Sequence, residues 1–333
     1  MTKQSWLRIA GVVGLTGASL FVPGAQAART AVPGTVNYVE GKVFIDGNPL
    51  STQQNGQAAL QADQSLTVEN GKAEVLLSPG AFLRVGSNSE VRMVAPELAN
   101  PKVEVVRGEA MVEVDQKPKQ ARLDILERGA DASLLKEGLY KFDADEATVA
   151  VIDGKVQLDD NGSSKKFGKG KEVTLTGAEL KPVKFDRKAE DELYRWSDVR
   201  SGYLAEANEA AARSVYVSGG WDGWGPGWFW NPYFSTWSWM PGDGFFWSPF
   251  GYPFYSPGYV IYAPTYGPRY YRGGAAIVPP RGRGLPGRAA GPAFRSPAFR
   301  APGAGFRGPA MGMRGGGGFH SMGGGVHGMG GRR

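Results

Sequence analysis

Apolar and polar residues alternate with a period of two from Thr35 to Leu175. Clear examples are the segments 42–45, 73–77, 103–106, 110–114 and 148–152, which are short and rich in Val, Ile, Leu and Phe. Runs of this kind, bounded by Gly, Asn, Asp or Pro, are typical of β-strands. The pattern predicts an all-β domain over residues 32–180, either a sandwich or a short β-helix-like roll of hairpins.

A glycine recurs just before several of these strands, at Gly41, Gly71, Gly108 and Gly154. Glycine adopts a positive φ without steric cost, and tight turns between paired strands use this geometry. We therefore expect a hairpin turn at each of these positions. The intervals between them are unequal, so the sequence does not predict a solenoid.

The order of these steps resembles the FecR domain family. The segments that carry the resemblance are 34–36, 41–43, 66–68, 71–75, 79–86, 88–91, 105–110 and 149–156. Together they cover about residues 34–178, and they imply a periplasmic all-β sensory or binding module. Signal-transducing members of the family place a cytoplasmic anti-sigma segment and a membrane helix before this domain. Here only about eight residues precede the first apolar run, so the resemblance is to the periplasmic module without the anti-sigma segment.

The period changes to 3.6 over residues 186–213, which predicts one α-helix. Asp186 is placed as its N-cap, and the acidic residues of the first turns suit the helix dipole. Leu193, Trp196, Tyr203 and Leu204 share one face with Val199 or Arg200. We expect this face to pack on the β domain.

Aromatic residues dominate the segment 214–272. Between Trp221 and Tyr271, 21 of 51 residues are Trp, Tyr or Phe, and prolines interrupt them throughout. Proline prevents a long helix or a central strand, so the segment is predicted to be irregular. Such rings suit stacking on sugars, insertion at a membrane interface or self-association; in the alternative, part of the segment covers an apolar face of the β domain. The candidate ligand-binding residues are Trp221, Trp224, Trp228, Trp230, Trp237 and Trp239.

Glycine and arginine dominate the last segment, 273–333, which contains 20 Gly and 7 Pro in 61 residues. This composition predicts disorder. Arg295, Arg300 and Arg307 each follow a Phe, and this pairing suits a polyanion through charge and stacking together. A separate hypothesis concerns His320, Met322, His327 and Met329, because imidazole and thioether groups together suit Cu(I); the alternative is incidental Met and His in a Gly-rich tail.

Charge divides the chain in the same place. Residues 28–213 hold 25 Lys and Arg against 30 Asp and Glu, whereas residues 214–333 hold 11 Arg against 2 Asp. The first part is therefore near −5 and the second near +9, an asymmetry typical of interaction tails. The predicted partner is acidic envelope polysaccharide or another envelope polyanion, with self-association or the chain's own acidic domain as alternatives.

The N-terminus has the pattern of an export signal. Lys3 and Arg8 precede an apolar run over 9–22, and Ala25-Gln26-Ala27 supplies the small residues that signal peptidase requires. Cleavage is predicted between Ala27 and Ala28, with an uncleaved anchor as the alternative. No later apolar run has membrane length, so we expect a periplasmic or extracellular protein with no nucleic-acid partner.

Catalytic chemistry has little support in the sequence. Cysteine is absent, and the two histidines lie in the Gly-rich tail. No paired carboxylates or nucleophile motif stand out, so neither an enzyme nor a cofactor is expected. The sequence favours a non-enzymatic binding or sensory module at the cell envelope. The alternatives are a matrix protein that self-assembles through the aromatic segment, and a signalling partner of an outer-membrane receptor.

Overall fold

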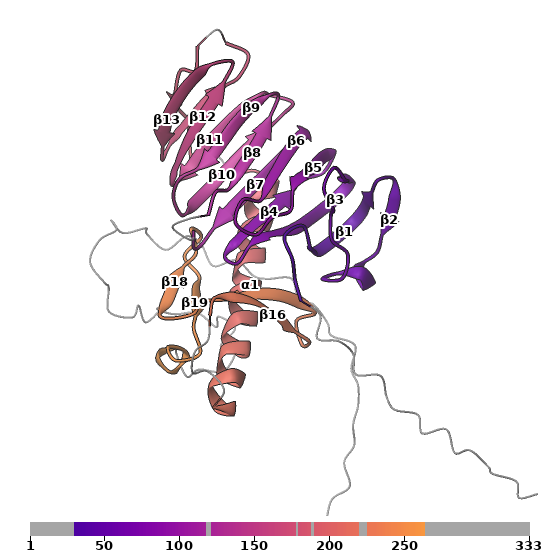
Figure 1. Cartoon of the computed structure of the whole chain (residues 1–333), viewed down its shortest axis with the longest axis vertical. Helices are drawn as coiled ribbons and strands as arrows, with labels where there is room; N and C mark the ends of the chain where they lie inside the picture. The colour runs from indigo at the N-terminus through magenta and orange to yellow at the C-terminus, as the bar shows by residue number, and fades with distance from the viewer. Residues whose placement is uncertain (1–29, 118–120, 178, 188–189, 220–224, 264–333) are drawn as a thin grey trace, which may run out of the picture. The chain divides into compact units, whose positions relative to one another are not determined.

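The computed structural model describes residues 30–117, 121–177, 179–187, 190–219 and 225–263. Its main feature is a 15-stranded sheet, which is accompanied by one long helix and two small hairpins (Figure 1). The strands of the sheet are β1 (Val36–Ile45), β2 (Asn48–Leu50), β3 (Ser65–Ser78), β4 (Ala81–Val85), β5 (Ser89–Ala95), β6 (Lys102–Arg107), β7 (Glu109–Val114), β8 (Asp124–Glu127), β9 (Ala130–Leu134), β10 (Gly138–Asp143), β11 (Thr148–Asp153), β12 (Lys155–Asp160), β13 (Ser163–Gly168), β14 (Lys171–Thr174) and β15 (Val183–Lys184). The prediction of an all-β fold followed by one helix is confirmed.

The sheet curls on itself around β1 and β3. One arm runs β4-β7-β10-β11-β14-β15 and the other runs β5-β6-β8-β9-β12-β13, and β3 pairs with the first strand of both arms. Of the two alternatives left by the sequence, the structure is nearest to a roll, because both arms belong to one continuous curled sheet. All pairings are antiparallel except that of β6 with β8.

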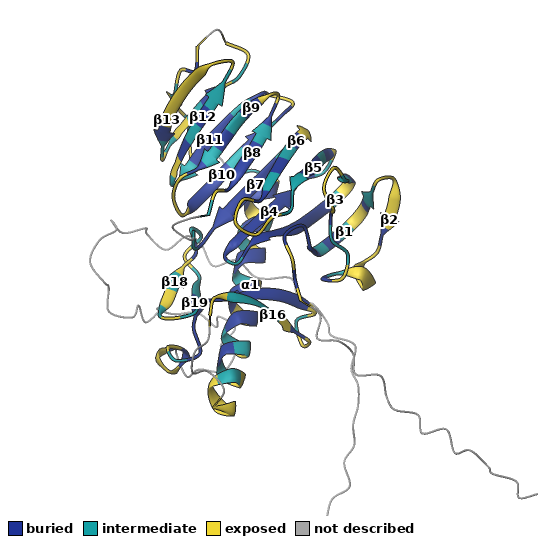
Figure 2. Cartoon of the chain, viewed as in Figure 1, coloured by how far each residue is buried: buried dark blue, intermediate teal, exposed yellow. Residues whose placement is uncertain are grey.

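The main core consists of buried residues from the strands of both arms, and Figure 2 shows buried positions along many of these strands. Val75, Leu83 and Val112 come from the β3–β4–β7 side, and Val105 and Ile125 come from β6 and β8. All five are at most 1% exposed. The period-two pattern therefore places the inward face as predicted.

The four recurring glycines have the predicted backbone conformation but not the predicted role. Their φ angles are positive, yet Gly41 and Gly71 pair with each other inside β1 and β3, where the long strands bend. Gly108 and Gly154 join β6 to β7 and β11 to β12, which are strands of opposite arms that do not pair. The expectation of hairpin turns here is corrected: these glycines lie where the chain bends or crosses between the arms.

Close packing explains why glycine is required at these crossings. A Cβ atom on Gly108 would lie 2.3 Å from Ser89 Oγ, and one on Gly154 would lie 2.3 Å from Tyr140 Oη. Both distances are well inside van der Waals contact. A single-residue connection leaves no space for a side chain, so the sequence repeat reflects crowding as well as φ.

Helix α1 spans Glu192–Ser218 rather than the predicted 186–213. The chain remains extended through β15, and the N-cap is Asp191, whose side chain accepts a hydrogen bond from the Tyr194 N–H at 2.7 Å. Gly219 ends the helix with φ 71°. The helix packs on the outer face of the β4–β7–β10 arm, as expected, but Val199 is exposed and Arg200 is buried. No helix within the described ranges is long and apolar enough to span a membrane.

Part of the aromatic segment is ordered, which corrects the prediction that it is irregular. Two hairpins form, β16 (Gly227–Asn231) with β17 (Thr236–Met240) and β18 (Phe245–Trp247) with β19 (Pro253–Tyr255), followed by the 3-10 turn η2 (Val260–Tyr262). Both hairpins contact α1. The strands are only three to five residues long, which is how the prolines between them are accommodated.

Candidate functional site

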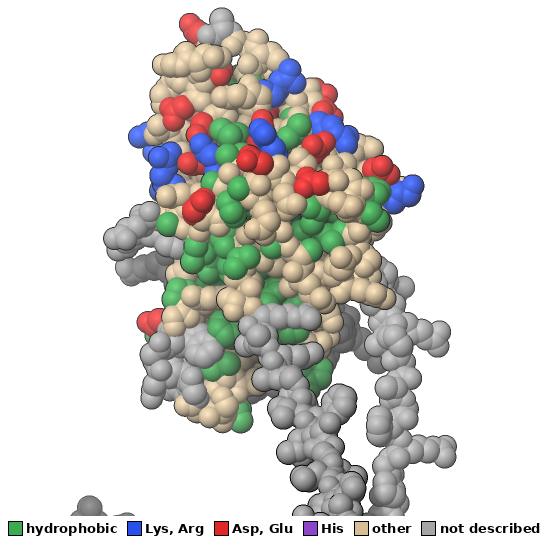
Figure 3. Space-filling model, turned by 45° about the vertical axis from the view of Figure 1, so that its right-hand side comes forward, with side chains coloured by type: hydrophobic (Ala, Val, Ile, Leu, Met, Phe, Trp, Pro, Cys, Tyr) green, Lys and Arg blue, Asp and Glu red, His purple; other side chains and the backbone are tan. Residues whose placement is uncertain are grey.

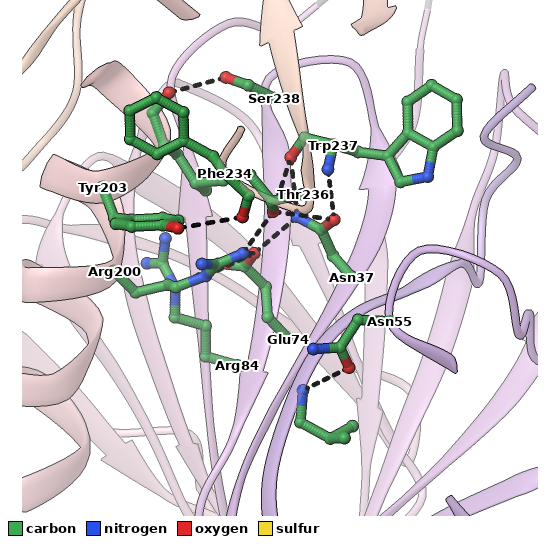
Figure 4. Close-up of polar contacts among 12 residues, drawn as sticks. Asn37, Asn55, Glu74, Arg84, Arg200, Tyr203, Phe234, Thr236, Trp237 and Ser238 are labelled. Atoms are coloured by element: carbon green, nitrogen blue, oxygen red, sulfur yellow. Dashed lines mark hydrogen bonds and ion pairs between the residues drawn. The ribbon is translucent and has the colours of Figure 1, made fainter. Parts of the chain in front are cut away.

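A buried polar network lies beneath α1, on the outer face of the sheet (Figure 4). At its centre is Arg84 of β4, which has no exposed surface. Its guanidinium forms ion pairs with Glu74 of β3, at 3.1 Å from Nε to Oε2, and with Glu113 of β7. Burial disfavours the cation, but the two carboxylates outweigh this and raise the pKa of Arg84. The network therefore holds its charge by pairing within the protein.

Helix α1 supplies the second cation of this network. The Arg200 guanidinium donates from Nε to Glu74 Oε1 at 3.1 Å and from Nη2 to Thr236 Oγ1 at 2.6 Å. The same guanidinium lies over the rings of Tyr38 and Tyr203, 4.6 and 5.2 Å from their centroids. Two guanidinium groups thus face two carboxylates, and the sheet, the helix and β17 meet at one buried point.

Strand β17 is held to the sheet by an amide that mimics backbone pairing. Asn37 of β1 donates from Nδ2 to the Trp237 carbonyl and accepts at Oδ1 from the Trp237 N–H, both at 2.8 Å. The same Nδ2 also donates to Glu74 at 2.8 Å. Asn37 is fully buried, so each of these bonds forms away from water.

A second amide, Asn208 in the middle of α1, ties both hairpins to the helix. Its Nδ2 donates to the carbonyls of Trp239 and Tyr255 at 3.0 Å, and its Oδ1 accepts from the Tyr255 N–H at 2.7 Å. Buried amides in a helix are costly unless paired. Their pairing here shows that α1 and the two hairpins form one packed unit on the sheet.

Asp115, just after β7, extends the polar network towards the first hairpin, β16–β17. Burial and the neighbouring Glu113 raise its pKa well above the ordinary value, although the Trp239 indole N–H donates to it at 3.0 Å. Glu113 in turn accepts from Ser201 of α1 at 2.6 Å. These side chains are closed off from solvent, so the network is suited to holding the C-terminal segment in place rather than to binding a ligand.

The structure separates the predicted tryptophans into two groups. Trp237 and Trp239 are 3% and 0% exposed and pack in the interior, where Trp239 stacks on Phe254 at 5.6 Å between ring centroids. As binding residues these two are corrected, because a ligand in solvent cannot reach their rings while the hairpins are in place. Trp228 is half-buried and Trp230 is exposed. The alternative that the segment covers a face of the β domain therefore holds for residues 225–263.

Other aromatic residues, which the sequence analysis did not single out, are exposed. Phe245, Trp247, Tyr259, Ile261 and Tyr262 form what we call the aromatic tip, and all lie in or beside β18, β19 and η2. Charged side chains gather mainly over the upper part of the view in Figure 3, and hydrophobic ones gather below them. No charged residue occurs between Gly244 and Ala263.

Two cavities of about 310 and 300 Å³ open on the sheet. The first lies on the β8–β9–β12 side and includes Arg122, Asp124 and Ser133, which are bonded to one another. The second lies beside the start of α1, with Met111 and Ile152 among its apolar lining and Glu146 and Glu172 among its acidic lining. In the first cavity the Ser133 hydroxyl donates to Asp124 at 2.6 Å, and no histidine belongs to the lining of either cavity.

A single buried carboxyl stands apart from the network. Glu127 ends β8 and is 1% exposed, and neither of its carboxyl oxygens has a hydrogen-bond partner. Burial, reinforced by the charge of Asp143 and partly offset by Arg128, raises its pKa to about 8. This side chain is therefore protonated at neutral pH.

The remaining predicted site residues lie outside the described residues. They are Trp221, Trp224, Arg295, Arg300, Arg307, His320, Met322, His327, Met329, Ala27 and Ala28. Within the described ranges, no group of three or more His, Asp or Glu side chains is arranged to hold a metal ion. The polymer, copper and cleavage assignments for these residues stay predictions.

Comparison with known proteins gives a family for the β domain. Residues 63–157 match the family model described as FecR protein, so this part of the chain is similar to that family. The match runs from the start of β3 into β12, which is narrower than the resemblance over 34–178. The other strands of the sheet, α1 and the hairpins lie outside it.

Structural comparison adds little beyond the family. Two crystal structures of a chain described as a "putative anti-sigma factor" from Parabacteroides distasonis ATCC 8503 are similar, with 22% identity and a TM-score of 0.33. The similarity covers 37% of this chain, which spans 61% of the length of that one. A comparison with curated proteins gave no match.

The sequence reasoning missed the buried network, although a signal was present. Arg84 and Glu113 each interrupt a strand whose flanking residues are apolar on both sides, as in Leu83-Arg84-Val85 and Val112-Glu113-Val114. A strand that is apolar on both faces is typically buried on both. Opposite charges within two such strands therefore indicate an ion pair under a covering element.

Proposed function

We propose that this chain is a non-enzymatic binding or sensory module at the cell envelope, exported and attached to acidic envelope polymer through its Arg-rich tail. The observation that carries the proposal is the FecR domain joined to a segment of opposite charge. Residues 28–213 hold five more acids than bases, whereas residues 214–333 hold 11 Arg against 2 Asp. The family model supports a regulator-like β domain.

The tail is the part suited to attachment. Single exposed ion pairs contribute only about 0–1 kcal/mol each, but several on one chain combine through effective concentration. On the β domain, by contrast, acids outnumber bases, and some of its surface cations are paired with acids, as in Arg92 with Glu104 and Lys102 with Asp131. The β domain therefore carries little positive charge to spare for an acidic polymer, whereas the sequence of the tail supplies eleven Arg.

The test is retention of the purified chain on isolated cell envelope as ionic strength rises. We expect steeply salt-dependent binding, because screening shortens the range of exposed charges to about 8 Å at physiological salt. Replacing all eleven arginines after Ser214 with Gln should abolish most of it, whereas replacing them with Lys should preserve most of it. The folded residues stay unchanged in both variants.

Two results would contradict the proposal. Equal retention of the Gln and wild-type chains would exclude attachment by tail charge. Concentration-dependent assembly without envelope retention would instead favour the matrix protein. The proposal includes no catalytic role. The third alternative, a signalling partner of an outer-membrane receptor, requires a protein ligand, whereas retention through the charge of the tail does not.

A further inference from the structure

We propose that the aromatic tip docks onto the surface of an anionic lipid bilayer. This rests on the envelope location of the proposed function but concerns a different surface from the tail. The tip consists of Phe245, Trp247, Tyr259, Ile261 and Tyr262, with exposures between 39% and 73%. Trp237, Trp239 and Phe254 already fill the space between the hairpins and α1, so the side chains of the tip lie on the outside.

Short-range contacts join the tip into one surface. Phe245 lies 6.2 Å from Trp247 and 6.1 Å from Tyr255 between ring centroids, and Tyr259 lies 5.9 Å from Tyr262. Tyr255 shares a small buried cluster with Val260 of η2. The backbone also connects β18 to the approach of η2, since the Ser256 N–H donates to the Gly244 carbonyl at 2.9 Å.

The aromatic tip packs on a buried hydrophobic cluster. The cluster under it includes Ala212 of α1, Met240 of β17 and Tyr255 of β19, all buried. Asn208 fixes β19 to the helix through hydrogen bonds in both directions. The rings are thus presented on a fixed base, which lowers the entropy lost on docking.

The chemistry of the tip fits the interfacial region of a bilayer. Trp and Tyr are enriched at the level of the lipid headgroups, where a ring has both apolar and polar neighbours. Ile261 and Phe245 add apolar surface for the acyl boundary. No Asp, Glu, Lys or Arg occurs between Gly244 and Ala263, and the neighbouring charges of α1, Arg213 and Glu209, are paired with each other, so docking of the tip itself dehydrates no unpaired charge.

The sequence that follows the tip selects an anionic surface. The chain continues from η2 into residues 264–333, which contain eleven Arg and no acidic residue. Basic segments next to an apolar anchor strengthen binding to anionic headgroups. Docking onto the tip of a second copy would bring two such segments together, and like charge opposes that. A bilayer that contains anionic lipid offers both an interface for the rings and negative headgroups for the arginines.

The experiment uses the chain from Ala28 onward, which keeps every described residue and omits the apolar run 9–22. Sedimentation with vesicles of two parts phosphatidylcholine to one part phosphatidylglycerol should show binding, and vesicles of phosphatidylcholine alone should bind markedly less. Ile261→Asp and Tyr262→Asp should each weaken binding about 10-fold, because each removes apolar contact and adds a charge. Tyr233→Asp is the matched control: Tyr233 is 94% exposed but lies in the β16–β17 turn, outside the tip, and its vesicle affinity should stay near that of wild type.

A second measurement reports on depth. Brominated lipid should quench the tryptophan fluorescence of the wild-type chain more than that of Trp247→Phe, because Trp247 enters the interface. Unchanged vesicle affinity in both tip variants, or an equal loss in Tyr233→Asp, would overturn the proposal. The proposal would also be overturned if the wild-type chain does not bind vesicles and the tip variants lose self-association in ultracentrifugation, because the tip would then dock onto a second copy of the chain. The two proposals can fail separately. If the wild-type chain does not bind vesicles, but envelope retention is lost only in the Arg→Gln chain, the docking proposal is wrong and the proposed function stands.

Discussion

Glu127 provides a direct test of how burial sets the stability of this sheet. Its carboxyl is 1% exposed, both oxygens lack hydrogen-bond partners, and its pKa is raised from 4.5 to about 8 by burial first and by Asp143 second. The folded state therefore holds this proton more tightly than the unfolded chain. The stability that the protonated form confers is fully present below about pH 4.5, and it is lost as pH rises towards about 8.

The size of the effect follows from the two pKa values. At about 1.4 kcal/mol per pKa unit, the difference between 4.5 and about 8 corresponds to at most about 5 kcal/mol of unfolding free energy. Water entry and local relaxation around the charged form reduce this, so we expect about 2–4 kcal/mol. Glu127→Gln removes the titration while keeping the shape of the side chain.

The assay is urea unfolding followed by circular dichroism from about pH 5 to about pH 9. Near pH 5 the variant and the wild type should have similar stability. Near pH 9 the variant should be the more stable by about 2–4 kcal/mol. Glu97→Gln, on an exposed loop, is the control and should change stability by less than about 0.5 kcal/mol at either pH. Parallel pH profiles for Glu127→Gln and wild type would refute the reasoning.

Two further predictions concern the ion network and the crossings between the arms. Arg84→Met should lower the unfolding free energy by about 3–5 kcal/mol, because it leaves Glu74 and Glu113 buried without their central cation. Adding Glu74→Gln to that variant should recover part of the loss in urea unfolding, and no recovery would argue against charge as the cause. Gly154→Ala should cost about 2–4 kcal/mol through strain and crowding, since the new Cβ would lie 2.3 Å from Tyr140 Oη. Gly162→Ala, which has a similar positive φ but open space, should cost only about 1 kcal/mol, and an equal cost at both sites would mean that crowding plays no part.

The sequence predicted the fold class well because the period-two signal is local. Val103, Val105 and Ile125 lie on the inward face that alternation assigns to them. The prediction from sequence was wrong where one local pattern is compatible with two tertiary arrangements. A Gly with positive φ between two strands fits a hairpin turn and a crossing between arms equally well, and only the pairing of β6 with β5 and β8 shows that Gly108 is a crossing.

The helix boundaries and the aromatic hairpins were harder for a related reason. Asp186 and Asp191 are both good N-caps, and pairing of β15 with β14 keeps the chain extended as far as Lys184, just before the first of them. In the aromatic segment, proline forbids long strands but not strands of three to five residues. The buried positions of Trp237 and Trp239 depend on contacts with residues more than 100 positions away, such as Asn37 and Asp115, which no local pattern records.

The covering of one sheet face determines where a ligand or surface can act. Helix α1 and the hairpins bury the outer face of the β4–β7–β10 arm. The ion network beneath them is buried, so separating the helix and hairpins from the sheet would leave buried charges without their partners. The opposite arm carries side chains of both charges, some of them paired, as in Arg107 with Glu90. The aromatic tip combines several large exposed rings in a segment that contains no charged residue. A substitution such as Trp247→Ser should therefore leave the unfolding free energy within about 0.5 kcal/mol of wild type while weakening vesicle binding. A large loss of stability would mean instead that Trp247 belongs to the packed core.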